Sequence, residues 1–78
     1  MRPVAYSHAT RRGTFWIALQ ADGRWHIVFE GGSLDPHGDP QTAAEELANG
    51  YCTWPWFGDP STLGISEDLG DWEAHFSR

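Results

Sequence analysis

One β-hairpin signal constrains this chain more than any other feature of its sequence. Two segments rich in β-branched and aromatic residues, Thr14–Gln20 and Trp25–Glu30, flank the tetrapeptide Ala21-Asp22-Gly23-Arg24. Asp-Gly is a preferred centre for a two-residue type I′ turn, in which both central residues have positive φ. The sequence therefore predicts two antiparallel strands joined at Asp22-Gly23.

The predicted turn also sets which residues of the hairpin share a face. With Asp22-Gly23 at the centre, Gln20 lies opposite Trp25, and the pairs alternate between faces from there. The expected pairs are Gln20 with Trp25, Ala18 with Ile27 and Trp16 with Phe29 on one face, and Leu19 with His26, Ile17 with Val28 and Phe15 with Glu30 on the other. Because both faces are apolar, we expect a helix to cover one and the C-terminal segment or a partner to cover the other.

The main helix is expected over Pro40–Asn49. Asp39 suits the N-cap, since its carboxylate can accept orphan amide hydrogens, and proline is tolerated at the first helical position. An apolar stripe of small side chains follows on one face of this helix: Ala43, Ala44, Leu47 and Ala48. This stripe suits close packing on an aromatic sheet.

Three further segments complete the predicted fold. Residues 4–8 and 72–76 alternate weakly as strands do, whereas Glu30–Pro40 is rich in glycine, proline and aspartate and reads as a turn-rich connection. Ser66 is expected to cap a short helical turn. The predicted fold class is α+β: a small antiparallel sheet of three to four strands, with the Asp-Gly hairpin at its centre, packed against one main α-helix.

Length and cysteine content predict one small cytoplasmic domain over residues 1–78. A chain of 78 residues buries only roughly 60% of the surface that its unfolded form exposes, which leaves room for a single core. Cys52 is the only cysteine, so an internal disulfide is excluded and a reducing compartment is favoured. Without a long apolar run or an apolar leader, the sequence predicts no membrane contact.

Negative charge dominates most of the chain. The formal net charge is −6, and from Trp25 to Ser77 there are ten acidic residues and no arginine or lysine. Such a surface repels phosphate backbones, so direct nucleic-acid binding is not expected, and it attracts basic grooves on other proteins. The acidic candidates for partner binding are Glu45 and Glu46 on the helix and Asp68, Asp71 and Glu73 near the C-terminus. The alternative is that these acids only keep a tryptophan-rich domain soluble.

The segment Trp54-Pro55-Trp56-Phe57 is the densest aromatic cluster. It forms either a satellite core under a loop or an interface anchor with at least one exposed ring. Trp54 and Trp56 therefore join the candidate partner-binding residues. Base stacking is disfavoured, because it needs a basic groove and the surrounding segment is acidic.

The sequence predicts no enzyme activity, no cofactor and no metal. The four histidines do not have the spacing of a known metal site, and one cysteine cannot support a structural zinc site. Asp35-Pro36-His37-Gly38-Asp39 places two acids around a histidine, but its residues are those of an ordinary turn. Ser33 lies in no nucleophile-elbow sequence.

In size and charge the chain is similar to anti-CRISPR proteins of phages and mobile elements. The shared features are a short single domain, a strongly acidic composition and the absence of lysine. The resemblance implies a non-catalytic bacterial or phage protein that docks on a basic protein or nucleoprotein complex, inhibits its binding of nucleic acid, and does so in some cases by nucleic-acid mimicry. The alternative is an accessory or oligomerising structural module whose acidic surface only confers solubility.

Overall fold

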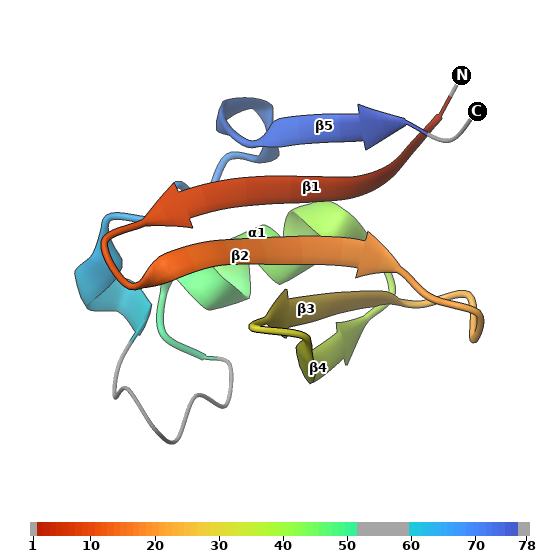
Figure 1. Ribbon diagram of the computed structural model, residues 1–78, viewed down its shortest axis with the longest axis horizontal. Helices are drawn as coiled ribbons and strands as arrows, with labels where there is room; N and C mark the ends of the chain where they lie inside the picture. The colour runs from red at the N-terminus through yellow and green to blue at the C-terminus, as the bar shows by residue number, and fades with distance from the viewer. Residues whose placement is uncertain (1, 52–59, 77–78) are drawn as a thin grey trace.

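The computed structural model describes residues 2–51 and 60–76. Within them lie five strands: β1 (Pro3–Thr10), β2 (Gly13–Leu19), β3 (Trp25–Phe29), β4 (Gly32–His37) and β5 (Glu73–Phe76). One α-helix, α1 (Pro40–Ala48), and two short 3-10 helices, η1 (Pro60–Leu63) and η2 (Leu69–Asp71), accompany them. The strands form one antiparallel sheet in the order β4-β3-β2-β1-β5 (Figure 1). The α+β class is confirmed, with five strands in place of the expected three to four.

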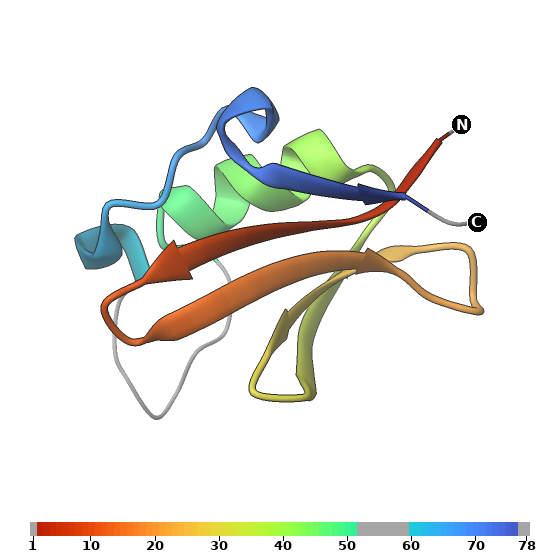
Figure 2. The same cartoon turned by 45° about the horizontal axis from the view of Figure 1, so that its top comes forward.

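The helix covers one face of the sheet, and the core lies between these two layers (Figure 2). α1 packs against β2, β3 and β4. The rings of Phe15 and Phe29 stack across β2 and β3 with their centroids 4.4 Å apart. The buried apolar side chains come from the sheet, from α1 and from the C-terminal segment: Phe15, Ile17, Ile27, Phe29, Ala43, Ala44, Leu47, Ile65 and Trp72. The buried alanines confirm that the small stripe of the helix faces the aromatic sheet.

α1 begins at the predicted residue. Asp39 Oδ1 accepts a hydrogen bond from the Thr42 backbone N–H at 2.8 Å, and Oδ2 accepts one from the Thr42 hydroxyl at 2.9 Å. These hydrogen bonds, led by the backbone one, hold the pKa of Asp39 below its usual value because they stabilise the charged carboxylate. Pro40 follows as the first helical residue.

The register of the β2–β3 hairpin differs by one residue from the prediction. The observed pairs are Phe15 with Phe29, Trp16 with Val28, Ile17 with Ile27, Ala18 with His26 and Leu19 with Trp25. Gly23 has a φ of 78°, but Asp22 is not in the positive-φ region, so the turn is not type I′. Gly23 N–H donates to the Gln20 carbonyl at 3.0 Å, and Gln20 N–H donates to the Arg24 carbonyl at 2.9 Å. This is the pattern of a three-residue loop that ends in a left-handed glycine.

The side chain of Asp22 accounts for the longer loop. Its Oδ1 accepts the backbone N–H of Arg24 at 2.9 Å, the local hydrogen bond that aspartate makes with the residue two positions on. A one-residue shift in register changes which side chains share a face. Ile17 therefore lies with Ile27 on the helix side, and Trp16 lies with Val28 on the other side. The hairpin has one strongly apolar face and one mixed face.

The segment predicted as a turn-rich connection contains strand β4, so that prediction was wrong. Glu30 and Gly31, with φ values of 52° and 81°, form a two-residue turn between the paired residues Phe29 and Gly32. β4 then pairs with β3 as far as His37. Because β4 is at the edge of the sheet, Pro36 is tolerated within it.

The C-terminal segment extends the sheet and does not cover its second face. Asp68, and not the predicted Ser66, caps the short helix η2, since its Oδ1 accepts the Gly70 N–H at 2.9 Å. Trp72 is buried in the core and donates its indole N–H to the Ser66 carbonyl at 2.9 Å. β5 pairs with β1 at the edge opposite to β4. In the described part of the chain, no element packs on the face away from α1, which we call the open face (Figure 2).

Candidate functional site

Two segments far apart in the sequence, α1 and the turn before η2, meet through the side chain of Gln41. Its Nε2 donates to Glu45 Oε2 at 2.8 Å and to the Glu67 carbonyl at 2.9 Å. Its Oε1 accepts the backbone N–H of Leu69 at 3.1 Å. One neutral amide therefore links the Glu45 carboxylate to the backbone of Glu67 and Leu69.

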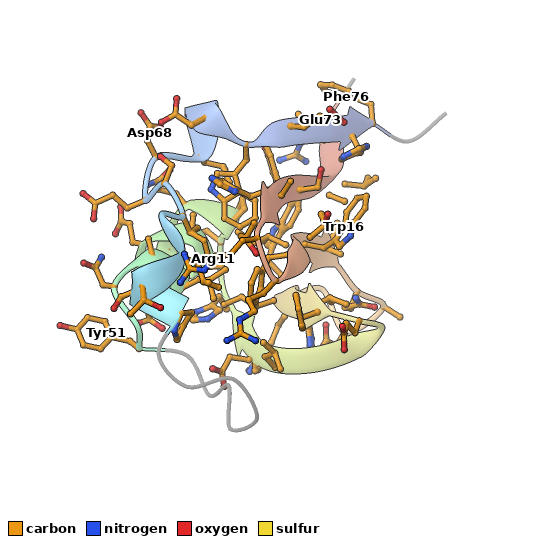
Figure 3. All side chains as sticks on the ribbon, turned by 60° about the vertical axis from the view of Figure 1, so that its left-hand side comes forward. Arg11, Trp16, Tyr51, Asp68, Glu73 and Phe76 are labelled. Carbon is orange, nitrogen blue, oxygen red and sulfur yellow. The ribbon has the colours of Figure 1, made fainter. Side chains whose placement is uncertain are left out.

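Two further neutral side chains complete this junction. Asn49 Nδ2 donates to Glu67 Oε2 at 3.1 Å, and the Ser66 hydroxyl donates to Asp71 Oδ2 at 2.7 Å. The same hydroxyl accepts the Asp68 N–H at 3.1 Å. Together these contacts gather four exposed carboxylates, which we call the acidic face: Glu45, Glu67, Asp68 and Asp71. Asp68 points outward from this side of the molecule (Figure 3).

Within residues 2–51 and 60–76, no arginine pairs with the acidic face. Each of its four carboxylates accepts a hydrogen bond from a neutral group: two side-chain amides, one hydroxyl and one backbone N–H. Arg11 donates instead to the Thr62 carbonyl at 3.1 Å. The excess of acids in the sequence thus becomes a local surface charge that attracts cations and basic groups.

The structure separates the remaining acidic candidates from this face. Glu46 lies beside β4, with its Oε2 3.5 Å from His37 Nδ1. Ser7 in β1 pairs with Trp16 in β2 and with Glu73 in β5, so these side chains share one face of the sheet. Glu73 is therefore on the open face (Figure 3). Trp54 and Trp56 lie outside the described residues.

Glu67 is the member of the acidic face that the sequence-based candidates omitted. It directly precedes Asp68, and this adjacency was the available signal. Its proximity to Glu45 depends on hydrogen bonds that span 26 and 18 residues, from Gln41 and Asn49. No local pattern predicts such contacts.

The open face carries an exposed tryptophan beside a histidine. Trp16 is 36% exposed, and its ring centroid lies 4.8 Å from that of His75. Ser7 Oγ is 2.8 Å from His75 Nε2, and Glu73 Oε2 is 3.5 Å from the same nitrogen. Phe76, 53% exposed at the end of β5, alternates with His75 and so lies on the helix side of the sheet. The open face is a second candidate surface, of mixed polarity.

A hydrogen-bonded chain of Asp22, His26 and Ser33 links the β2–β3 turn to β4. His26 Nε2 lies 2.8 Å from Asp22 Oδ2, and His26 Nδ1 lies 2.7 Å from Ser33 Oγ. The backbone N–H of Arg24, followed by the bond from His26, keeps the pKa of Asp22 below its usual value. These residues border a hollow of about 450 Å³. The sequence did not predict this hydrogen-bonded chain, because Ser33 was expected in the turn-rich connection and not in a strand.

The same residue types form the triad of serine hydrolases. In that triad, however, the serine bonds the histidine Nε2 and the aspartate bonds Nδ1, whereas here Ser33 lies at Nδ1 of His26 and Asp22 lies at Nε2. Ser33 is exposed on the edge strand β4. The arrangement accounts for the attachment of the turn to β4, and we assign it that structural role.

The turn before α1 does not gather metal ligands. Both carboxylate oxygens of Asp39 accept hydrogen bonds from Thr42. The buried His37 Nε2 has no hydrogen-bonding partner among the described residues. In the described ranges, no group of three histidine, cysteine, aspartate or glutamate side chains could hold a metal ion. None of the helices there is long and apolar enough to cross a membrane.

Comparison with known proteins found no matching family model, no matching curated protein and no matching solved structure.

Proposed function

We propose that this protein is a non-catalytic binding protein that docks its acidic face on a basic surface of a partner protein. The observation that carries the proposal is the gathering of Glu45, Glu67, Asp68 and Asp71 on one side by neutral hydrogen-bond donors. None of these carboxylates is used in an internal ion pair within the described residues. All four are available to lysine and arginine side chains of a partner.

Two physical effects support binding by such a surface. Its field attracts a basic partner at long range and raises the association rate, and carboxylates form short charge-assisted hydrogen bonds with guanidinium groups at contact. Each carboxylate already has an internal hydrogen bond that restrains its position. Less side-chain freedom is therefore lost on docking.

We further propose that the partner is a nucleic-acid-binding protein or a nucleoprotein complex. A groove that binds phosphates presents several lysine and arginine side chains, which is the charge pattern complementary to the acidic face. The likeness in size and charge to anti-CRISPR proteins supports the same class of partner. The protein then acts as an inhibitor by competing with nucleic acid for the groove.

The test compares two double variants of equal charge. Glu45→Gln with Glu67→Gln neutralises part of the acidic face, and Glu30→Gln with Glu73→Gln neutralises exposed carboxylates away from it. Each pair changes the formal net charge from −6 to −4, because two negative charges are removed. The glutamine side chains keep the size of glutamate and its ability to accept hydrogen bonds.

Wild type and both variants are immobilised and exposed to a bacterial lysate, and the retained proteins are identified by mass spectrometry. We expect a basic partner that the wild type and the Glu30/Glu73 variant retain and the Glu45/Glu67 variant loses. Salt and added duplex DNA should both release this partner. Retention of the same proteins by all three, unaffected by salt, contradicts the proposal.

The exposed Trp16 side chain of the open face favours a second function, that of an oligomerising module. The Trp16 ring is 36% exposed and is an apolar group that a second copy could cover. Light scattering at two protein concentrations tests this function. A dimer that Trp16→Gln dissociates supports it, and a monomer at both concentrations excludes it.

A further inference from the structure

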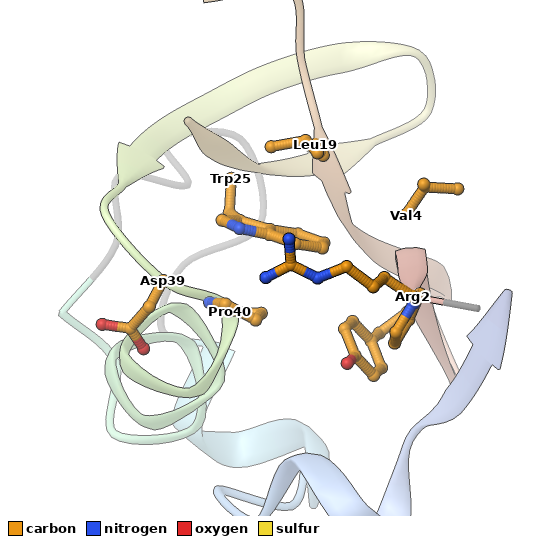
Figure 4. A pocket seen from close by; sticks show the side chains of 8 residues that line it. Arg2, Val4, Leu19, Trp25, Asp39 and Pro40 are labelled. Atoms are coloured by element: carbon orange, nitrogen blue, oxygen red, sulfur yellow. The ribbon is translucent and has the colours of Figure 1, made fainter. Parts of the chain in front are cut away.

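A hollow lies on the helix side of the sheet, beyond the N-terminal end of α1. With nine residues, α1 is about 14 Å long. With eight residues, β1 spans about 26 Å. The helix is therefore too short to cover the whole face. A cavity of about 630 Å³ occupies the uncovered part, between β1, the β2–β3 hairpin and the start of α1 (Figure 4).

The walls of this cavity are mostly apolar and aromatic. They include Val4, Tyr6, Leu19, Trp25 and Pro40. The rings of Tyr6 and Trp25 lie 5.9 Å apart and are inclined at 45°, so they form two adjoining flat surfaces. Small-molecule pockets have volumes of about 300–1,000 Å³ and walls of this composition. A planar apolar group fits this chemistry.

Three residues that line the same cavity carry hydrogen-bond donors: Arg2 a guanidinium, Tyr6 a hydroxyl and Trp25 an indole N–H. Within the described part of the chain, none of these groups has a hydrogen-bond acceptor. Figure 4 shows the Arg2 side chain extending into the cavity toward Trp25. A ligand that fits this cavity has an apolar body and a hydrogen-bond acceptor for these donors. The acceptor that pairs best with a guanidinium is a planar oxyanion such as a carboxylate.

We propose that this cavity binds a small aromatic carboxylate. The aromatic body lies against Trp25 and Tyr6, and the carboxylate accepts hydrogen bonds from Arg2. This site lies on the helix side of the sheet, near the start of α1. Ligand binding there does not depend on the acidic face or on a protein partner.

The charges around the cavity favour a monoanion over a phosphate dianion. Arg2 brings one positive charge, while Asp39 borders the same cavity and the chain as a whole carries −6. A second negative charge on the ligand would find no second cation among the residues that line the cavity, and Asp39 would repel it. Nucleotides should therefore bind more weakly than aromatic carboxylates.

The experiment titrates the full chain, labelled with ¹⁵N, with 2-naphthoate and follows backbone amide and indole N–H signals. A ligand of this size should bind saturably with a Kd on the order of 0.1–1 mM. The largest shifts should fall on the Trp25 indole and on Tyr6 and Leu19. The neutral probe 2-naphthalenemethanol and the dianion 2-naphthyl phosphate should both bind more weakly.

Three variants locate the site. Arg2→Gln, at an exposed position, should weaken 2-naphthoate binding roughly tenfold and leave the neutral probe unchanged. Leu19→Gln, also at an exposed position, should weaken both probes. Trp16→Leu, on the open face, should change neither. Equal binding of acid and alcohol, full affinity in Arg2→Gln, or shifts centred on Trp16 would each overturn the proposal.

Discussion

Truncating Ile17 distinguishes the observed hairpin register from the one predicted by the sequence. In the structure Ile17 is fully buried opposite Ile27, and Val28 lies opposite Trp16 on the open face. In the predicted register, Ile17 and Val28 were neighbours on the same face. Ile17→Ala and Val28→Ala should therefore differ strongly in stability under the observed register, and only modestly under the predicted one.

The size of the difference follows from burial. Ile17→Ala removes three buried carbon groups and leaves a cavity against α1, which should destabilise the protein by about 2–4 kcal/mol. Val28→Ala removes two carbons from a half-exposed site that opens to water, and about 0.5–1 kcal/mol is expected. A domain of this length has a total unfolding free energy of roughly 4–12 kcal/mol. Ile17→Val, with a loss of about 1 kcal/mol, stays measurable if Ile17→Ala does not fold.

Urea denaturation followed by tryptophan fluorescence and far-ultraviolet circular dichroism measures these free energies. The two probes should give one transition with an unchanged slope for each variant that folds. Similar losses for Ile17→Ala and Val28→Ala, or a larger loss for Val28→Ala, would refute the reasoning.

Three further outcomes are expected. Gly23→Val should lower the unfolding free energy by at least about 1 kcal/mol, because it forces a β-branched residue to a φ of 78°; an unchanged urea midpoint would place the left-handed turn residue elsewhere. Asp39→Ala should lower the melting temperature at pH 7 but have little effect at pH 2. The pKa of Asp39 is lowered by folding, so its stabilisation of the folded state is present above its unfolded pKa of about 3.9 and is lost as the pH falls through its folded pKa. Equal losses at both pH values would argue against the cap. Ser33 should not react with a fluorophosphonate probe, because His26 meets it through Nδ1 and not through Nε2 as in the triad, and labelling that His26→Gln abolishes would instead indicate a hydrolase.

The features that the sequence predicted correctly depend on neighbouring residues. Asp39 and Pro40 specify the start of α1 through contacts within one helical turn. The β-branched and aromatic residues of β2 and β3 and the weak alternation in β5 likewise predict strands from local sequence. These signals sufficed for the α+β class.

The features that it missed depend on a choice between similar local structures or on distant contacts. Asp-Gly is compatible with a two-residue and a three-residue loop, and the bond from Asp22 to Arg24 accompanies the longer one. Pro36 excludes a central strand but not an edge strand, and the sequence does not say where the edge lies. The acidic face required Gln41 to join α1 to residues near Leu69, which no periodicity predicts.

The most direct test of the central claim is the affinity of the captured partner for the two charge-matched double variants at two ionic strengths. At about 50 mM salt, neutralising Glu45 and Glu67 should weaken binding roughly five- to thirtyfold, and at about 300 mM salt the loss should shrink because screening weakens the remaining attraction. The Glu30/Glu73 variant should bind within about twofold of wild type at both salt concentrations. Equal weakening by the two variants would show that only the net charge matters, and unchanged affinity in both would contradict an acidic docking face.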